Sequence, residues 1–216
     1  MGMKAIIIAS GHFDPTPSME TELRQAPLVV AADGGARHLR KLGMLPHVII
    51  GDLDSLPKAD KAFYENAQVP FITYPSRKDQ TDTDICIHHA LEQGADEITF
   101  MGVTGTRLDH TLANIFLLRP LNQRGIRSRI RDRHNDIYLV STEMKELVIQ
   151  GSPGDYLSLV ALSDTVEGIY LSGLEYPLEN ADLNRGSSLG VSNCFTGPQA
   201  KVSIRSGCLM VSRSRD

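Results

Sequence analysis

Short apolar runs rich in isoleucine and valine alternate with amphipathic segments up to about residue 125. Runs of this kind are typical of strands that are buried on both faces of a parallel sheet. They predict strands at 4–9, 28–32, 47–51, 70–74 and 97–101. The segments between them predict helices at 35–42, 57–67, 82–93 and 108–123, the last with an apolar face of Leu108, Leu112, Ile115, Phe116 and Leu118. The pattern indicates an α/β domain with a mostly parallel, Rossmann-like sheet.

The pattern changes at about residue 126, where helical periodicity ends. Apolar and polar residues then alternate, as at 155–160, 169–171 and 201–204. Turn signals rich in glycine, proline and serine separate these stretches at 151–154, 196–198 and 206–207. We therefore expect a smaller all-β sandwich domain after the first one, with domains at 1–135 and 136–216.

Composition excludes several classes of protein. The 216 residues are 41% hydrophobic, which is enough for a buried core. With 22 basic and 26 acidic residues the net charge is −4 and no basic stripe is visible, so nucleic acid is not expected as a partner. No apolar stretch is long enough to cross a bilayer, and the first apolar run fits a strand rather than a signal peptide. The three cysteines lack metal-ligand spacing, and together these features predict a cytoplasmic protein.

Aspartates follow four of the predicted strands. Because ligands collect beyond the carboxyl ends of the strands in an open parallel sheet, these residues should share one edge. So many carboxylates are unfavourable together unless a cation lies between them, and oxygen ligands without cysteine favour Mg²⁺ bound with nucleotide phosphates. Asp52 and Asp54 can face the same ion across a turn. The strand-end aspartates are Asp33, Asp52, Asp54, Asp79, Asp82, Asp84 and Asp109.

Glycines and cations lie beside these aspartates. The backbone amides of Gly34, Gly35, Gly102 and Gly105 can approach phosphate oxygens, and Arg77, Lys78 and Arg107 can supply positive charge. The segment 102–107 lacks the ending of a P-loop, and no Gly-x-Gly-x-x-Gly follows the first strand. A Walker-type NTPase and an ordinary dinucleotide dehydrogenase are therefore disfavoured.

Each motif also has a purely structural interpretation. Asp33 with the two glycines after it can be a strand-to-helix turn, and Thr81 or Asp82 can cap the helix that follows. Asp109 can complement a helix N-terminus. The segment 10–12 can contact a nucleotide or form an ordinary turn. A shared site accounts for all of these motifs at one edge of the sheet, whereas the structural interpretation needs a separate reason for each.

Four ordered motifs together resemble the thiamin pyrophosphokinase (thiamin diphosphokinase) family, and the resemblance runs nearly end to end. The motifs are Ala-Asp-Gly-Gly-Ala at 32–36, the stretch 46–55 that ends in Gly-Asp-Leu-Asp-Ser, Lys-Asp-Gln-Thr-Asp at 78–82 and Gly-Thr-Arg-Leu-Asp-His at 105–110. The resemblance implies transfer of diphosphate from ATP to the hydroxyl of thiamin, which yields thiamin diphosphate and AMP and requires Mg²⁺.

The resemblance also implies roles for the residues of the first domain. Asp52, Asp54, Asp79 and Asp82 would hold Mg²⁺ and the triphosphate, with Arg107 and Asp109 completing the catalytic pocket. The remaining nucleotide contacts would come from Asp33, Gly34, Gly35, Arg77, Lys78, Gln80, Thr81, Gly105, Thr106 and His110.

For the second domain the resemblance implies a β-sandwich that binds thiamin, in a homodimer with thiamin where the two subunits meet. Ser192 and Asn193 match the family's Ser-Asn segment and would hydrogen-bond thiamin, although a hairpin turn is the alternative for this pair. Eukaryotic members stack a tryptophan on thiamin, but this chain has no tryptophan. Tyr176 is our prediction for that place, because a tyrosine face can also stack on a cationic ring.

Two other functions compete with this interpretation. One is a diphosphokinase of the same fold that acts on another hydroxymethyl heterocycle, such as a pterin, because the aspartate motifs recognise ATP rather than the acceptor. The other is a non-catalytic nucleotide sensor, which has less need of several metal-facing carboxylates.

Overall fold

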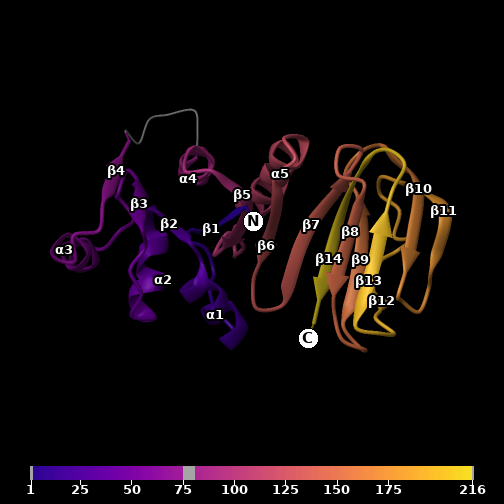
Figure 1. The fold of residues 1–216 in the computed structure, drawn as a ribbon, viewed down its shortest axis with the longest axis horizontal. Coiled ribbons are helices and arrows are strands. Elements are labelled where there is room, and N and C mark those ends of the chain that lie inside the picture. The colour runs from indigo at the N-terminus through magenta and orange to yellow at the C-terminus, as the bar shows by residue number, and fades with distance from the viewer. Residues whose placement is uncertain (1, 75–80, 216) are drawn as a thin grey trace. The chain divides into compact units, whose positions relative to one another are not determined.

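The computed structural model describes residues 2–74 and 81–215 and divides the chain into two compact units (Figure 1). The first unit contains residues 1–117 and 130–133, and the second contains residues 118–129 and 134–216. Helix α5 (Leu108–Gln123) and strand β6 (Arg127–Arg131) contribute residues to both units. The domain boundary expected between residues 135 and 136 stays a prediction.

The first unit contains a parallel sheet with the strand order β5-β1-β2-β3-β4. Strand β1 lies between β5 and β2 and pairs Ile6 with Val29 of β2 on one side and with Thr99 of β5 on the other. Covered on both faces, these strands consist mostly of buried apolar residues, which is why they are visible in the sequence as continuous runs. The predicted α/β fold class is confirmed, with strands β1 (Met3–Ile8), β2 (Leu28–Ala32), β3 (Val48–Gly51), β4 (Phe71–Thr73) and β5 (Ala95–Met101).

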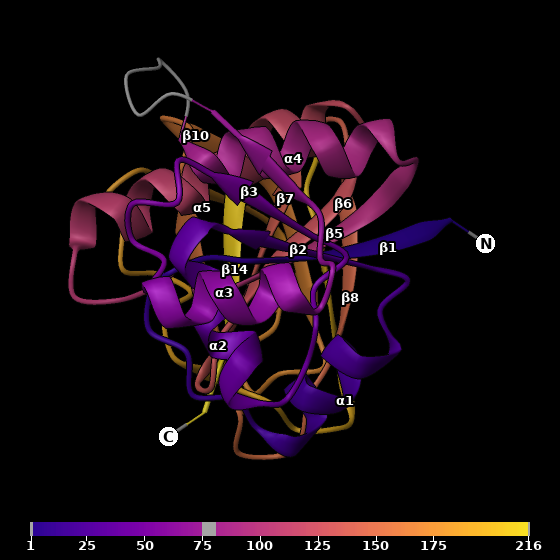
Figure 2. The ribbon, with the colours of Figure 1, turned by 90° about the vertical axis from the view of Figure 1, so that its left-hand side faces the viewer.

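Helices cover both faces of this sheet. Figure 2 shows α4 (Asp82–Glu92) on one face and α1 (Pro17–Gln25), α2 (Ala36–Lys41) and α3 (Lys58–Asn66) on the other. The second group buries Met19, Leu23, Leu39 and Tyr64 against the apolar side chains of β1, β2 and β3. None of the helices in the described part of the chain combines the length and the apolar character that a membrane span requires.

Helix α1 is an element for which the sequence analysis made no prediction. Thr16 caps its start by accepting a hydrogen bond from the backbone N–H of Met19 at 3.4 Å, and Pro17 occupies the first turn. Only Met19 and Leu23 face the core, four residues apart. With two buried positions in nine residues, the helix has little periodicity to detect, and the cap followed by proline is its clearest signal.

The apolar face predicted for α5 is only partly buried. Ile115 and Leu118 are buried, whereas Leu108, Leu112 and Phe116 are exposed. Around a 3.6-residue helix these positions follow the order 118, 115, 108, 112 and 116, so only one edge of the predicted apolar face is buried.

The second unit contains two antiparallel sheets whose inner faces form one core. The sequence alternation is visible in β9, where Leu157, Leu159 and Ala161 are buried and the residues between them are not. The predicted all-β sandwich is confirmed. One sheet has the order β12 (Asn193–Cys194), β9 (Tyr156–Ala161), β14 (Cys208–Ser214) and β7 (Asn135–Ser141); the other has β11 (Leu178–Asn184), β10 (Thr165–Ser172), β13 (Gln199–Ser203) and β8 (Glu146–Gln150).

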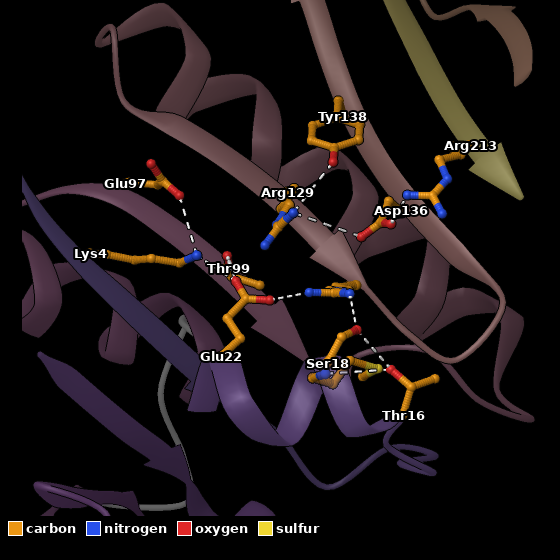
Figure 3. A network of polar contacts seen from close by, with 12 residues as sticks. Lys4, Thr16, Ser18, Glu22, Glu97, Thr99, Arg129, Asp136, Tyr138 and Arg213 are labelled. Carbon is orange, nitrogen blue, oxygen red and sulfur yellow. Dashed lines mark hydrogen bonds and ion pairs between the residues drawn. The ribbon is translucent and has the colours of Figure 1, made fainter. Parts of the chain in front are cut away.

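An ionic network fixes α1 to the strands of the first unit (Figure 3). The Glu22 carboxylate, whose side chain is 10% exposed, accepts hydrogen bonds from Lys4 Nζ at 2.5 Å and from Thr99 Oγ1 at 3.4 Å. Arg131 also donates to Glu22, and its second terminal nitrogen donates to Ser18 Oγ at 2.7 Å. A single carboxylate of α1 is thus bonded to side chains of β1, β5 and β6.

A second network lies within the second unit (Figure 3). The buried Asp136 carboxylate of β7 is 3.4 Å from Arg213 Nη1 and 3.9 Å from Arg129 Nη1. Arg213 also donates from Nε to Asp155 at 3.0 Å. Burial raises the pKa of Tyr138, and the charge of Asp136 adds to this shift. The two arginines compensate the negative charge of the buried Asp136 carboxylate.

Candidate functional site

A cleft of about 1060 Å³ opens in the first unit beyond the carboxyl ends of β1, β2 and β5. Its walls are the segment after β1, the turn between β2 and α2, one side of α2, the first turn of α4, the segment after β5 and the first turns of α5. Most of the aspartate and glycine motifs found in the sequence border this cleft, at the edge of the sheet where ligands of α/β proteins collect.

Three carboxylates form the acidic part of the site. Asp33, Asp52 and Asp82 each place an oxygen so that the three atoms lie within 4.8 Å of one another. They come from three separate segments that follow β2, β3 and β4. Asp33, which the sequence analysis assigned to nucleotide contact rather than to metal, therefore joins two of the residues predicted to hold Mg²⁺.

Asp33 is the most deeply buried of the three carboxylates, with 6% of its surface exposed. Its Oδ2 accepts a hydrogen bond from Ser55 Oγ, and among the described residues no group donates to its buried Oδ1. Burial raises the pKa of Asp33, opposed by the backbone N–H of Gly34 and reinforced by the negative charges of Asp82, Asp52 and Asp54. A buried, repelled carboxylate with an unpartnered oxygen fits a divalent cation, and an all-oxygen donor set suits Mg²⁺.

Close packing explains the two glycines after Asp33. A Cβ on Gly35 would lie 2.2 Å from the carbonyl oxygen of Ile8, and one on Gly34 would lie 2.9 Å from Ser55 Oγ. Only glycine lets the turn approach the end of β1 this closely, so the turn interpretation holds together with the carboxylate cluster. Contact of these two amides with phosphate stays a prediction.

Of the two other residues predicted to hold Mg²⁺, the structure describes Asp54 but not Asp79. Asp54 is exposed and its backbone N–H donates to Asp52 Oδ1 at 3.2 Å, which places it beside the cluster. Asp79 lies outside the described residues, as do Arg77, Lys78 and Gln80. Their roles stay predictions.

The start of α4 resolves one structural alternative. Thr81 caps the helix: its Oγ1 accepts from the backbone N–H of Asp84 at 3.2 Å, and its own N–H donates to Asp84 Oδ2 at 3.1 Å. This cap makes Asp82 the first residue of α4 and holds its carboxylate toward the cluster. Thr81 also borders the cleft, so capping and ligand contact are compatible for this residue.

Arg107 and Asp109 form an exposed ion pair at the rim of the cleft, with Arg107 Nη2 2.6 Å from Asp109 Oδ2. The hydrogen bond from Arg107 lowers the pKa of Asp109. Asp109 also lies in the first turn of α5, so the helix-terminus interpretation describes its position. The expected neighbours Gly105, Thr106 and His110 border the same cleft.

One wall of the cleft, which α2 contributes, was not predicted from the sequence. Arg37, His38 and Lys41 border the cleft, and two of the three are permanent cations. The signal was the helix predicted directly after Asp33, where positions 37 and 41 share a face. The segment 10–12, for which nucleotide contact and an ordinary turn were both open, forms the adjoining wall.

In the second unit, Asn193 supports the segment that carries Tyr176. The Asn193 side chain, in a residue 4% exposed, accepts from the Tyr176 N–H at 3.0 Å and donates to the Tyr176 carbonyl at 2.7 Å. Tyr176 itself is 66% exposed. Ser192 is exposed in a turn with φ +59, and its N–H donates to Ser158 Oγ at 3.0 Å. The turn interpretation thus describes Ser192, whereas Asn193 begins strand β12 and its side chain holds the backbone of Tyr176.

Two family models match the chain in order. The model described as "Thiamin pyrophosphokinase, catalytic domain" matches residues 19–130, and the model described as "Thiamin pyrophosphokinase, vitamin B1 binding domain" matches residues 145–209. The first match contains the carboxylate cluster and most of the cleft, and the second contains Tyr176 and Asn193.

Relatives of known name agree with these matches along the whole chain. Thiamine pyrophosphokinase of Bacillus subtilis (strain 168) is 31% identical over 215 residues, which cover 99% of this chain and all of the relative. The crystal structure of thiamine pyrophosphokinase from Bacillus subtilis has a TM-score of 0.89 at 31% identity and 99% coverage of both chains. That of thiamin pyrophosphokinase from Geobacillus thermodenitrificans has a TM-score of 0.85 at 30% identity, with 99% of this chain and 98% of that chain covered. The chain therefore belongs to the thiamin pyrophosphokinase family.

Proposed function

We propose that the protein transfers diphosphate from ATP to the hydroxyl of thiamin in the cleft of the first unit, forming thiamin diphosphate and AMP. The observation that carries this proposal is the cluster of Asp33, Asp52 and Asp82, within 4.8 Å of one another, in a chain that matches both the catalytic and the vitamin B1 binding family models. The enzyme is accordingly a transferase of the thiamin diphosphokinase type.

The reaction suits the chemistry of the cleft. The hydroxyl oxygen of thiamin forms a bond to the β-phosphorus of ATP and loses its proton, while the bond from that phosphorus to the α-phosphate oxygen breaks and AMP leaves. Such a displacement needs positioning and neutralisation of charge more than covalent catalysis. The cleft offers both, since carboxylates line one part of it and the cationic side chains of Arg37, Lys41 and Arg107 line others.

The residues of the cluster fit Mg²⁺. Asp33, Asp52 and Asp82 would hold it, with Asp54 and Asp79 as the further ligands expected from the sequence. When bound, Mg²⁺ would supply positive charge that neutralises the negative charge developing on the phosphates. Among the described residues no donor reaches Oδ1 of Asp33, which supports this assignment because a buried carboxylate oxygen without a donor is unfavourable unless a cation approaches it.

The second unit would supply the thiamin contacts. Tyr176 presents an exposed ring, which can stack on the positively charged thiazolium of thiamin, and the exposed Ser192 lies one residue before the Asn193 that holds the Tyr176 backbone. An exposed aromatic ring is also suited to a subunit interface. We propose a homodimer with thiamin bound where the subunits meet, to be checked by sedimentation with and without thiamin. The cytoplasmic location stays a prediction.

A product assay tests the proposal. Purified protein is incubated with ATP, Mg²⁺ and thiamin, and the products are identified by mass spectrometry, with EDTA and the Asp33→Asn variant as matched controls. Thiamin diphosphate and AMP should appear together, be absent with EDTA and fall at least about 100-fold with the variant. If AMP forms only with a hydroxymethylpterin, the acceptor is wrong; if ATP binds and neither acceptor yields AMP, the protein is a nucleotide sensor.

A further inference from the structure

Two consecutive residues of α2 hold the segment that follows β1. Arg37 Nη2 donates to the carbonyl oxygen of Ser10 at 2.7 Å, and His38 Nε2 lies 3.0 Å from the carbonyl oxygen of Gly11. Since a carbonyl can only accept, the hydrogen of the His38 ring is on Nε2. His38 is 8% exposed, and the ring of Phe13 packs against it with the centroids 5.3 Å apart.

The opposite side of the same segment is bonded to the residues after β5. The N–H of Gly11 donates to the carbonyl of Gly102 at 2.7 Å, and the N–H of His12 donates to the carbonyl of Thr104 at 2.7 Å. A Cβ on Gly11 would lie 2.5 Å from both of those carbonyl oxygens, so the two segments are in close contact. The wall of the cleft at residues 10–12 is thus held by its N–H groups from one side and by its carbonyls from the other.

Helix α2 connects this wall to the carboxylate cluster. Asp33 precedes Arg37 and His38 by four and five residues, which is about one helical turn. All three border the cleft. The position of the wall relative to Asp33 is therefore set by one rigid element whose start is packed against the end of β1 through Gly35.

We propose that Arg37 and His38 are positioning residues for the nucleotide: by holding the carbonyls of Ser10 and Gly11, they set the distance between the wall at residues 10–12 and the carboxylates, so that the cleft is formed before ATP binds. This inference rests on the proposed function. His38 acts through the segment that it holds, whereas Arg37 also adds positive charge to the cleft. The two residues therefore give separable effects.

The expected effects follow from loss of preformed geometry. A wall displaced by about 1 Å can cost up to about 100-fold in rate. His38→Phe keeps the packing on Phe13 and removes the donor to Gly11, so we expect the KM for ATP to rise about tenfold with the KM for thiamin unchanged. His38→Gln can place an amide N–H near the same carbonyl and should restore most of the ATP affinity. Arg37→Met should raise the ATP KM as well, and Arg37→Lys should recover part of it.

Arg40 of the same helix provides the matched control. Its guanidinium pairs with Asp60 and lies 5.0 Å from the centre of the Phe63 ring, and it does not border the cleft. Arg40→Met should lower the free energy of unfolding and leave both KM values unchanged. A shift in the ATP KM as large as that of His38→Phe would show that any weakening of α2 has this effect.

The experiment measures KM for ATP and for thiamin, together with binding of ATP by calorimetry, for the six proteins. A rise in the ATP KM confined to the Arg37 and His38 variants, with recovery in His38→Gln, supports the proposal. Equal shifts in both KM values, or no shift in His38→Phe, overturn it. If the wild-type protein forms no product, the proposed function fails, and the calorimetric ATP affinities of the same variants still test the positioning role.

Discussion

Replacing Asp33 by asparagine separates the stability of the protein from its activity. Asparagine keeps the shape of the side chain and an oxygen that can accept from Ser55, but it removes the buried negative charge. Two unit charges 4.8 Å apart, the outer limit within the cluster, repel by about 1 kcal/mol at the dielectric constant of water and by about 3.5 kcal/mol at an effective constant of 20. Asp33 has two such neighbours and is also partly desolvated. We expect Asp33→Asn to raise the free energy of unfolding by about 1–3 kcal/mol without metal.

With Mg²⁺ bound, the wild-type protein should instead be more stable than Asp33→Asn. A cation that binds only the folded state stabilises it by about 2.7 kcal/mol at 100 times its Kd. The wild-type protein should gain this amount in urea unfolding when Mg²⁺ replaces EDTA, and Asp33→Asn should gain much less. Formation of thiamin diphosphate by the variant should fall at least about 100-fold, because the charge that positions the cation and the phosphates is lost.

Asp96→Asn is the control for the change in net charge, since Asp96 is an exposed carboxylate on β5 of the same unit. It should alter the free energy of unfolding by no more than about 0.5 kcal/mol and leave activity unchanged. The reasoning is refuted if Asp33→Asn is less stable than the wild-type protein in EDTA while Mg²⁺ stabilises both proteins equally.

Four further predictions concern single residues. Glu22→Gln should lower the free energy of unfolding by about 3 kcal/mol, because Lys4 and Arg131 lose a nearly buried carboxylate. Glu20→Gln, at a more exposed position of the same helix, should change it by less than about 0.5 kcal/mol, and equal losses in urea unfolding would contradict this prediction. Burial, together with the charge of a neighbouring arginine, lowers the pKa of His38 from 6.5 to about 4, so the unfolded chain takes up a proton at a higher pH than the folded protein. The contribution of His38 to the free energy of unfolding is therefore complete above pH 6.5 and decreases by up to about 3 kcal/mol as the pH falls toward 4. His38→Phe should lack this pH dependence when unfolding is measured across the same range. Tyr176→Ala should raise the KM for thiamin about tenfold and spare the KM for ATP in steady-state kinetics, and an unchanged thiamin KM would rule out stacking. Asp54→Asn should reduce Mg²⁺-dependent turnover, and wild-type turnover in a correctly folded variant would remove Asp54 from the metal site.

The sequence by itself was sufficient for the class of fold and for the location of the site. Strands buried on both faces must be apolar throughout, so β1, β2 and β3 were recognisable as continuous runs within one or two residues of their observed ends. Aspartates after such strands must lie at one edge of a parallel sheet, and this placement predicts the acidic cleft. The alternation after residue 126 likewise reflects strands with one buried face.

The tertiary structure decided which side chains meet, because contacts between distant segments depend on the rotation and register of whole elements. It joined Asp33 to Asp52 and Asp82, and it brought α2 to the cleft through a helix of six residues with too little periodicity to indicate its facing. It also directed the carboxamide of Asn193 to the backbone of Tyr176, a pairing between residues 17 positions apart that no local pattern specifies. Local patterns determine elements, whereas packing determines which of their side chains share a site.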